Sequence, residues 1–143
     1  MTTLFSCKKD EGTTTNPTTK TKTQYLTQKS WRDSIIYTRP DTNSTWTKLN
    51  FQDCKLDDIK NFKTDFSWSY ENGATKCNST DPQIWETGTW AFTSNETHLS
   101  YYRDFGASSH TLDWKIEQLD DNIFTFNYFY HPSPVYYRVI MVH

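Results

Sequence analysis

The sequence has few aliphatic and few helix-forming residues, and it contains no long apolar run. Only 34% of its 143 residues are hydrophobic, and the alanine, leucine, methionine and glutamine that favour helices are sparse. A transmembrane helix needs an apolar run of about 18 residues or more, and none is present. These absences argue against a helical bundle and predict that no helix of this chain spans a bilayer.

A surplus of positive charge is also missing. The chain has 15 lysines and arginines against 17 acidic residues, which gives a net charge of -2 at neutral pH. Nucleic-acid-binding proteins concentrate basic residues on one face, whereas here they are scattered along the chain. We therefore expect no nucleic-acid partner.

Motifs for catalysis or metal binding are absent as well. The sequence has no Cys-x-x-Cys pair, no His-Glu-x-x-His motif, no glycine-rich phosphate loop and no Gly-x-Ser-x-Gly elbow. The acidic pairs at 57–58 and 120–121 lie in predicted turns, where aspartate caps backbone N–H groups. The histidines fall at predicted strand ends, at a break or at the terminus: His98, His110, His131 and His143. We predict no catalytic residue, no metal site, no cofactor and no enzymatic activity.

Aromatic residues, by contrast, are abundant. The 6 tryptophans, 9 tyrosines and 9 phenylalanines make up about half of the hydrophobic residues, and such side chains suit a half-buried pleated sheet. Apolar and polar residues alternate most clearly at 112–116. A second alternating stretch, 62–70, places Phe66, Trp68 and Tyr70 on one face, which predicts half-buried strands at both places.

Turn signals divide the rest of the chain into about eight consecutive strands. Strands joined in order by tight turns form an up-and-down antiparallel sheet, and closing such a sheet removes its exposed edges. We predict one all-β domain over residues 25–143, folded as a single antiparallel up-and-down barrel. Residues 8–24 are polar and lack hydrophobic periodicity, so residues 1–24 are predicted to hold a short signal-peptide remnant and a disordered tether.

The same alternation predicts which side chains line the interior of the barrel. They are Trp68, Trp90, Trp114, Phe124, Phe126 and Tyr128. Two interpretations stay open. Each large aromatic side chain buries about 150–250 Å², so six of them can fill the interior, or they can line a pocket for one small apolar ligand. A register slip of one residue would reverse which rings face inward.

The residues Leu4-Phe5-Ser6-Cys7 resemble the lipobox of bacterial lipoprotein signal peptides. In that family the cysteine sulfur receives a diacylglycerol and the mature chain starts at the cysteine. The resemblance implies that Cys7 is lipidated and holds the protein on a lipid bilayer, since two or three acyl chains anchor a protein stably. A signal peptide needs an apolar stretch of about 7 to 15 residues, so we expect the coding sequence to extend upstream of Met1. The alternative is a free cysteine in a disordered tail.

The residues Lys9-Asp10-Glu11 resemble the Lys-acid-acid signal that sends lipoproteins of the Bacteroidota to the outer face of the outer membrane. This resemblance implies a lipid-anchored protein of the outer membrane, exposed at the cell surface or facing the periplasm. Such compartments permit disulfides, and with Cys7 assigned to lipid, Cys54 and Cys77 remain to form one. Two unrelated thiols are the alternative, because sequence alone does not fix pairing.

From about Tyr25 to its end, the chain resembles the lipocalin-like domains of Bacteroidota lipoproteins, a branch of the calycin barrels. The residues that carry the resemblance are Trp31, Cys54 with Asp57-Asp58, Gly73 to Cys77, Asp81-Pro82 and Gly88-Thr89-Trp90. It implies a monomeric, non-catalytic barrel that binds a small apolar molecule or a glycan. The alternative is a cell-surface interaction or scaffold module with a solid core, which meets its partners through loops such as 39–43 and 105–109.

Overall fold

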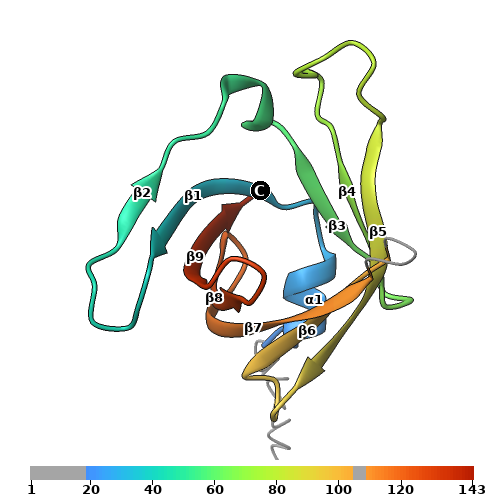
Figure 1. The fold of residues 1–143 in the computed structure, drawn as a ribbon. Coiled ribbons are helices and arrows are strands. Elements are labelled where there is room, and N and C mark those ends of the chain that lie inside the picture. The colour runs from blue at the N-terminus through green and yellow to red at the C-terminus, as the bar shows by residue number, and fades with distance from the viewer. Residues whose placement is uncertain (1–18, 105–108) are drawn as a thin grey trace, which may run out of the picture.

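A curled antiparallel sheet makes up most of the described protein, and a short helix near the start of the described chain packs against it (Figure 1). This computed structural model describes residues 19–104 and 109–143, so Cys7 and most of the predicted tether lie outside the described residues. The elements are α1 (Lys22–Thr27), β1 (Arg32–Arg39), β2 (Thr47–Leu49), the 3-10 turn η1 (Asp53–Lys55), β3 (Ile59–Phe62), β4 (Ser67–Glu71), β5 (Ile84–Thr93), β6 (His98–Arg103), β7 (His110–Leu119), β8 (Ile123–Tyr130) and β9 (Val135–Val142). None of the described helices has the length and apolar character needed to cross a membrane.

The strands follow one another in space almost as they do in sequence. Their order in the sheet is β2-β1-β9-β8-β7-β6-β5-β4-β3, and every neighbouring pair is antiparallel. From β3 to β9 each strand pairs with the next, and β1 then pairs with β9. The predicted all-β fold with an up-and-down antiparallel sheet is therefore confirmed.

The chain just before β1 meets β3, the strand at the far edge of the curled sheet, at one point. Trp31, just before β1, forms an isolated antiparallel bridge with Lys60 of β3. The Trp31 N–H donates to the Lys60 carbonyl at 2.9 Å, and the Lys60 N–H donates back at 2.6 Å. A single bridge does not amount to a continuous ladder between β1 and β3, so the closed barrel stays a prediction.

Helix α1 packs between β3 and β7. It begins with a capping box, in which the Gln24 N–H donates to the Thr21 hydroxyl and the Thr21 N–H donates to the Gln24 side chain. Leu26 is fully buried, and its carbonyl accepts a hydrogen bond from the Trp31 indole at 2.9 Å. The helix therefore begins at Lys22, within the segment 1–24 that was predicted to be a tether, and it ties this part of the chain to the core.

A column of stacked rings crosses the inner face of the sheet. Trp68 of β4 stacks on Tyr101 of β6 with ring centroids 3.9 Å apart, Tyr101 on Trp114 of β7 at 4.2 Å, and Trp114 on Phe126 of β8 at 4.0 Å. Close aromatic pairs add to the stabilisation that burial provides. The buried hydrophobic core consists of Leu26, Trp31, Phe62, Trp68, Trp90, Leu99, Tyr101, Trp114, Phe124, Phe126, Val139 and Met141.

Strand β5 lies between β4 and β6, and the column can cross it because β5 carries a glycine there. Gly88 pairs with Trp68 on one side and with Arg103 on the other. The Trp68 ring lies against Gly88, and its indole N–H donates to the Tyr102 carbonyl at 2.7 Å. A side chain at position 88 would occupy this space.

The prediction that Phe66 shares the buried face of Trp68 is wrong. Phe66 is 53% exposed and has a φ of 64°, and β4 starts only at the next residue. The cause is a turn: Asp65 accepts hydrogen bonds from the N–H and the hydroxyl of Ser67, and the Phe66 N–H donates to the Lys63 carbonyl at 3.0 Å. A residue in a turn does not follow the alternation of a strand.

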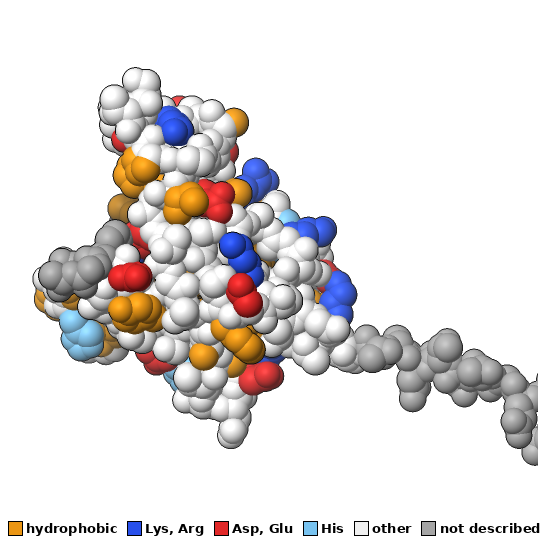
Figure 2. All heavy atoms as spheres, turned by 90° about the vertical axis from the view of Figure 1, so that its right-hand side faces the viewer, with side chains coloured by type: hydrophobic (Ala, Val, Ile, Leu, Met, Phe, Trp, Pro, Cys, Tyr) orange, Lys and Arg blue, Asp and Glu red, His pale blue; other side chains and the backbone are white. Residues whose placement is uncertain are grey.

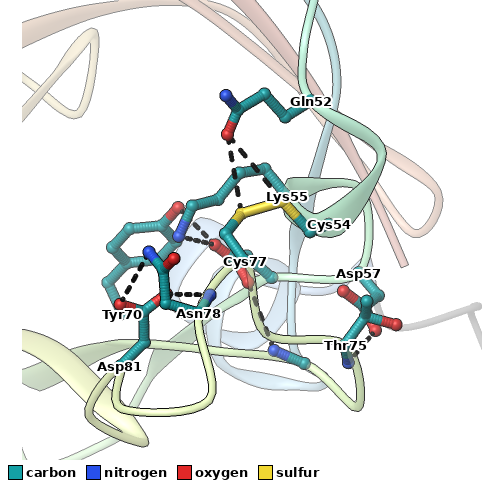
Figure 3. Close-up of a disulfide and its surroundings, with 11 residues drawn as sticks. Gln52, Cys54, Lys55, Asp57, Tyr70, Thr75, Cys77, Asn78 and Asp81 are labelled. Atoms are coloured by element: carbon teal, nitrogen blue, oxygen red, sulfur yellow. Dashed lines mark hydrogen bonds and ion pairs between the residues drawn. A yellow bond between two sulfur atoms is a disulfide. The ribbon is translucent and has the colours of Figure 1, made fainter.

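The predicted disulfide between Cys54 and Cys77 is confirmed (Figure 3). It joins η1 to the connection between β4 and β5, residues 72–83, with Cα atoms 5.1 Å apart. Nearby, Asp58 is buried and accepts from the Tyr70 hydroxyl at 2.8 Å, while the Lys55 ammonium lies 3.2 Å from it. Because a buried carboxylate needs such partners, these contacts and the disulfide together fix the loop on the sheet.

Candidate binding cleft

A cleft opens where the pairing of β7 with β8 ends. The β7–β8 ladder runs from Leu119–Phe124 to Lys115–Asn127. Beyond Lys115, β7 goes on pairing with β6 as far as His110, and β8 goes on pairing with β9 as far as Tyr130. The cleft lies over this stretch and has a volume of about 540 Å³, which falls within the range of small-molecule sites, about 300–1,000 Å³.

Four strands, β1, β7, β8 and β9, and two connecting segments contribute to the cleft wall, and about half of the lining side chains are aromatic or aliphatic. The lining residues are Arg39, Trp46, Thr111, Leu112, Asp113, Lys115, Asn127, Tyr128, Phe129, His131 and Tyr136. Most of the lining side chains of β7 to β9 belong to the outer face of the sheet, since they alternate with the buried Trp114, Phe126 and Val139. Most of the cleft thus lies on the other face of the sheet from the aromatic column, and Tyr128, which also lines the cleft, contacts Trp114 and Phe126 of the column.

Aromatic rings and one guanidinium group form the centre of the cleft. The Arg39 guanidinium lies 4.3 Å from the ring centroid of Trp46 and 5.5 Å from that of Tyr136. Phe129 packs on Tyr136 with centroids 4.8 Å apart, and His131 meets Phe129 edge to face at 4.8 Å. Arg39 and Tyr136 are cross-strand partners in the β1–β9 ladder, so the sheet register itself brings the cation to the rings.

A tight turn after β1 returns the chain so that Trp46 reaches Arg39. Asp41 accepts the backbone N–H groups of Asn43 and Ser44 at 2.8 and 2.9 Å and the Ser44 hydroxyl at 2.8 Å. Hydrogen bonds hold the pKa of Asp41 below its ordinary value. The bond from the Ser44 hydroxyl has the largest effect, and the bond from the Asn43 N–H the next largest. The carboxylate form therefore supports this turn at neutral pH.

Several polar groups of the cleft have unused hydrogen-bonding capacity. The Asn127 amide donates to Glu117 at 2.5 Å, but its Oδ1 is buried without a partner. Arg39 Nη1 donates to the Thr42 carbonyl at 3.1 Å, while Arg39 Nε has no acceptor. Buried polar atoms that lack a partner are energetically unfavourable, but these two atoms have no accessible surface. The polar groups of the lining that a ligand meets directly are the exposed Asp113 and Lys115.

Of the six side chains predicted to bind a ligand, Tyr128 alone lines the cleft. The other five pack against one another in the core: Trp68, Trp90, Trp114, Phe124 and Phe126. Sequence alternation found the inward face but gave no signal for the outer residues of the cleft. One sequence signal for aromatic residues on the outer face was the adjacent pair Tyr128 and Phe129, followed by His131. Neighbouring side chains of a strand point to opposite faces, so both rings cannot enter the core.

The burial of three tyrosine hydroxyls predicts that the protein loses stability at alkaline pH. Burial, before any other cause, raises the pKa values of Tyr70, Tyr101 and Tyr128 above the ordinary value of about 10. In the unfolded chain these hydroxyls ionise near pH 10, whereas in the folded protein they stay protonated. Their contribution to stability is full below about pH 10 and is lost as the pH rises toward the folded pKa values. Chemical denaturation from pH 8 to 12 should show the free energy of unfolding falling above pH 10, and a constant value would contradict this prediction.

The cleft contains no evident metal site. Within the described residues, no group of three or more histidine, cysteine, aspartate or glutamate side chains is placed to hold a metal ion. Asp113 lies 3.8 Å from His98 Nε2 and is 66% exposed. The chemistry that the cleft offers is therefore ring stacking, hydrogen bonding and charge.

A second hollow, of about 410 Å³, lies over β4 and β5. Figure 2 views this side of the molecule, and its hydrophobic side chains form separate patches between polar ones. Ile84 and Tyr102 are exposed there, beside the hydroxyl side chains of Ser67, Ser69, Thr87 and Thr89. Trp68 also lines this hollow, but its ring is buried and stacked on Tyr101. The cleft at β7 and β8 is the better candidate because a cation and aromatic rings are grouped in its lining.

No family model matches the sequence, and no curated protein matches it either. Inference about function therefore rests on the cleft and its residues.

Proposed function

We propose that this protein is a non-catalytic binding protein whose cleft takes a glycan. The observation that carries the proposal is the grouping of Trp46, Phe129 and Tyr136 with Arg39 around one cavity. Aromatic rings beside a few polar groups that fix orientation are typical of small-molecule sites.

A glycan fits this lining better than a purely apolar molecule. An aliphatic ligand would cover Asp113, Lys115 and Asn127 without replacing their hydrogen bonds to water, at a cost of about 1–3 kcal/mol for each group left unsatisfied. A sugar ring has apolar C–H faces that can lie on aromatic rings, and its hydroxyls can bond the polar groups. The centre of the sheet, meanwhile, is occupied by stacked rings.

Trp46→Ala tests this proposal directly. The substitution removes one ring and the platform under Arg39, so binding of any saccharide that the wild-type protein takes should weaken about tenfold. Calorimetry with a panel of neutral and acidic oligosaccharides measures the effect. Trp85→Ala is the matched control, since Trp85 packs on Lys55, away from the cleft. Equal affinity in Trp46→Ala, or no saccharide binding by the wild type, would contradict the proposal and favour the cell-surface interaction module.

We further propose that the binding domain is a lipocalin-like barrel anchored through acylated Cys7 in the outer membrane of a member of the Bacteroidota. The Cys54–Cys77 disulfide supports an oxidising compartment outside the cytosol. The Trp31–Lys60 bridge supports closure of the sheet. Mass spectrometry of the protein purified from bacterial membranes should find acyl chains on Cys7, and an unmodified thiol in that fraction would contradict the anchor.

A further inference from the structure

The cleft carries more positive charge than its own carboxylate neutralises. Arg39 and Lys115 both line it, and among residues 19–104 and 109–143 neither forms an ion pair. Asp113 is the one acidic side chain in the lining, and it faces His98. Asp41, two residues beyond Arg39, is held by the turn at Asn43 and Ser44. A complementary ligand would therefore bring negative charge.

Arg39 is held in an orientation suited to an anion. Its guanidinium is stacked over Trp46 and lies beside Tyr136, and its Nη1 is fixed by the Thr42 carbonyl. Its Nε is buried and has no acceptor, and within residues 19–104 and 109–143 its Nη2 forms no hydrogen bond. A guanidinium N–H group binds a carboxylate oxygen through a charge-assisted hydrogen bond.

Resting on the proposed function, we infer that the cleft selects acidic saccharides, with the sugar carboxylate bound at Arg39. The carboxylate accepts from Nη2 of Arg39, and the ring lies against Tyr136 and Phe129. A sugar hydroxyl donates to the exposed carboxylate of Asp113. Lys115 adds a second positive charge to the same cavity.

The decisive probes are pairs of oligosaccharides that differ only in charge. We would use trimers of galacturonate, glucuronate and mannuronate, each beside its methyl ester, with the full chain and isothermal calorimetry. A charge-assisted hydrogen bond contributes about 1.5–3 kcal/mol, so the best acid should bind at least about tenfold more tightly than its ester. In Arg39→Gln the acid and the ester should bind alike.

Arg32→Gln is the matched control, because Arg32 lies exposed on the same strand and outside the cleft. It removes the same charge and should keep the preference for the acid. Thermal unfolding of both variants checks that they fold. Two results would overturn the inference and leave the proposed function standing. One is equal binding of acid and ester by the wild type, and the other is a preference for the acid that remains in Arg39→Gln. No binding of any saccharide, neutral ones included, would overturn the proposed function itself.

Discussion

Replacing Gly88 with alanine is expected to destabilise the protein by at least about 3 kcal/mol. An added Cβ would overlap the backbone oxygen of Tyr102 and would lie 2.6 Å from the indole nitrogen of Trp68. The backbone oxygen belongs to a paired strand, so it cannot move away without breaking the β5–β6 ladder. Urea denaturation followed by tryptophan fluorescence measures the change.

Ala91→Val is the control for this experiment. Ala91 lies on the same strand and is exposed, and β-branched residues are favoured in strands. The control should therefore change stability by no more than about 0.5 kcal/mol. A Gly88→Ala protein as stable as the wild type would show that Trp68 does not cross β5 at this glycine.

Trp114→Ala is expected to be as damaging, with a loss of about 3–5 kcal/mol. Trp114 is 3% exposed and lies in the middle of the column, between Tyr101 and Phe126. Its removal leaves a cavity and breaks both stacks. Since folded domains are stable by about 5–15 kcal/mol, this variant should be close to unfolding, as urea denaturation will show.

Phenylalanine substitutions separate ring packing from hydrogen bonding. The Trp114 indole nitrogen is buried without a partner, whereas the Trp68 indole donates to Tyr102. Trp114→Phe keeps a ring and removes an unsatisfied donor, so it should cost less than Trp68→Phe, which leaves a carbonyl without its donor. The opposite order would contradict the observed hydrogen-bonding pattern.

Local patterns in the sequence were sufficient to predict the fold class and much of the core. Period-two alternation placed Trp114 and Phe126 on the inner face because successive side chains of a strand point to opposite faces. The alternation failed at Phe66, where Asp65 and Ser67 form a turn that residue types alone did not distinguish from the start of a strand.

The cleft depends on long-range pairing, which a local pattern does not encode. Arg39 meets Tyr136 through the β1–β9 register, and Trp46 reaches Arg39 through the turn at Asp41. The end of the β7–β8 ladder at Lys115–Asn127 likewise has no signature in composition. The sequence therefore predicted the inner rings as binding residues, and of these Tyr128 lines the cleft; it gave no signal for Arg39, Trp46 or Tyr136.

The six tryptophan indole N–H signals in an NMR spectrum test the central claim most directly. The protein has one tryptophan in the cleft, Trp46, and three of the predicted interior set in the core, Trp68, Trp90 and Trp114. On titration with a saccharide that binds, the account predicts that the Trp46 signal shifts and that the three core signals stay in place. Shifts confined to the core signals, with Trp46 unmoved, would contradict the cleft as the binding site.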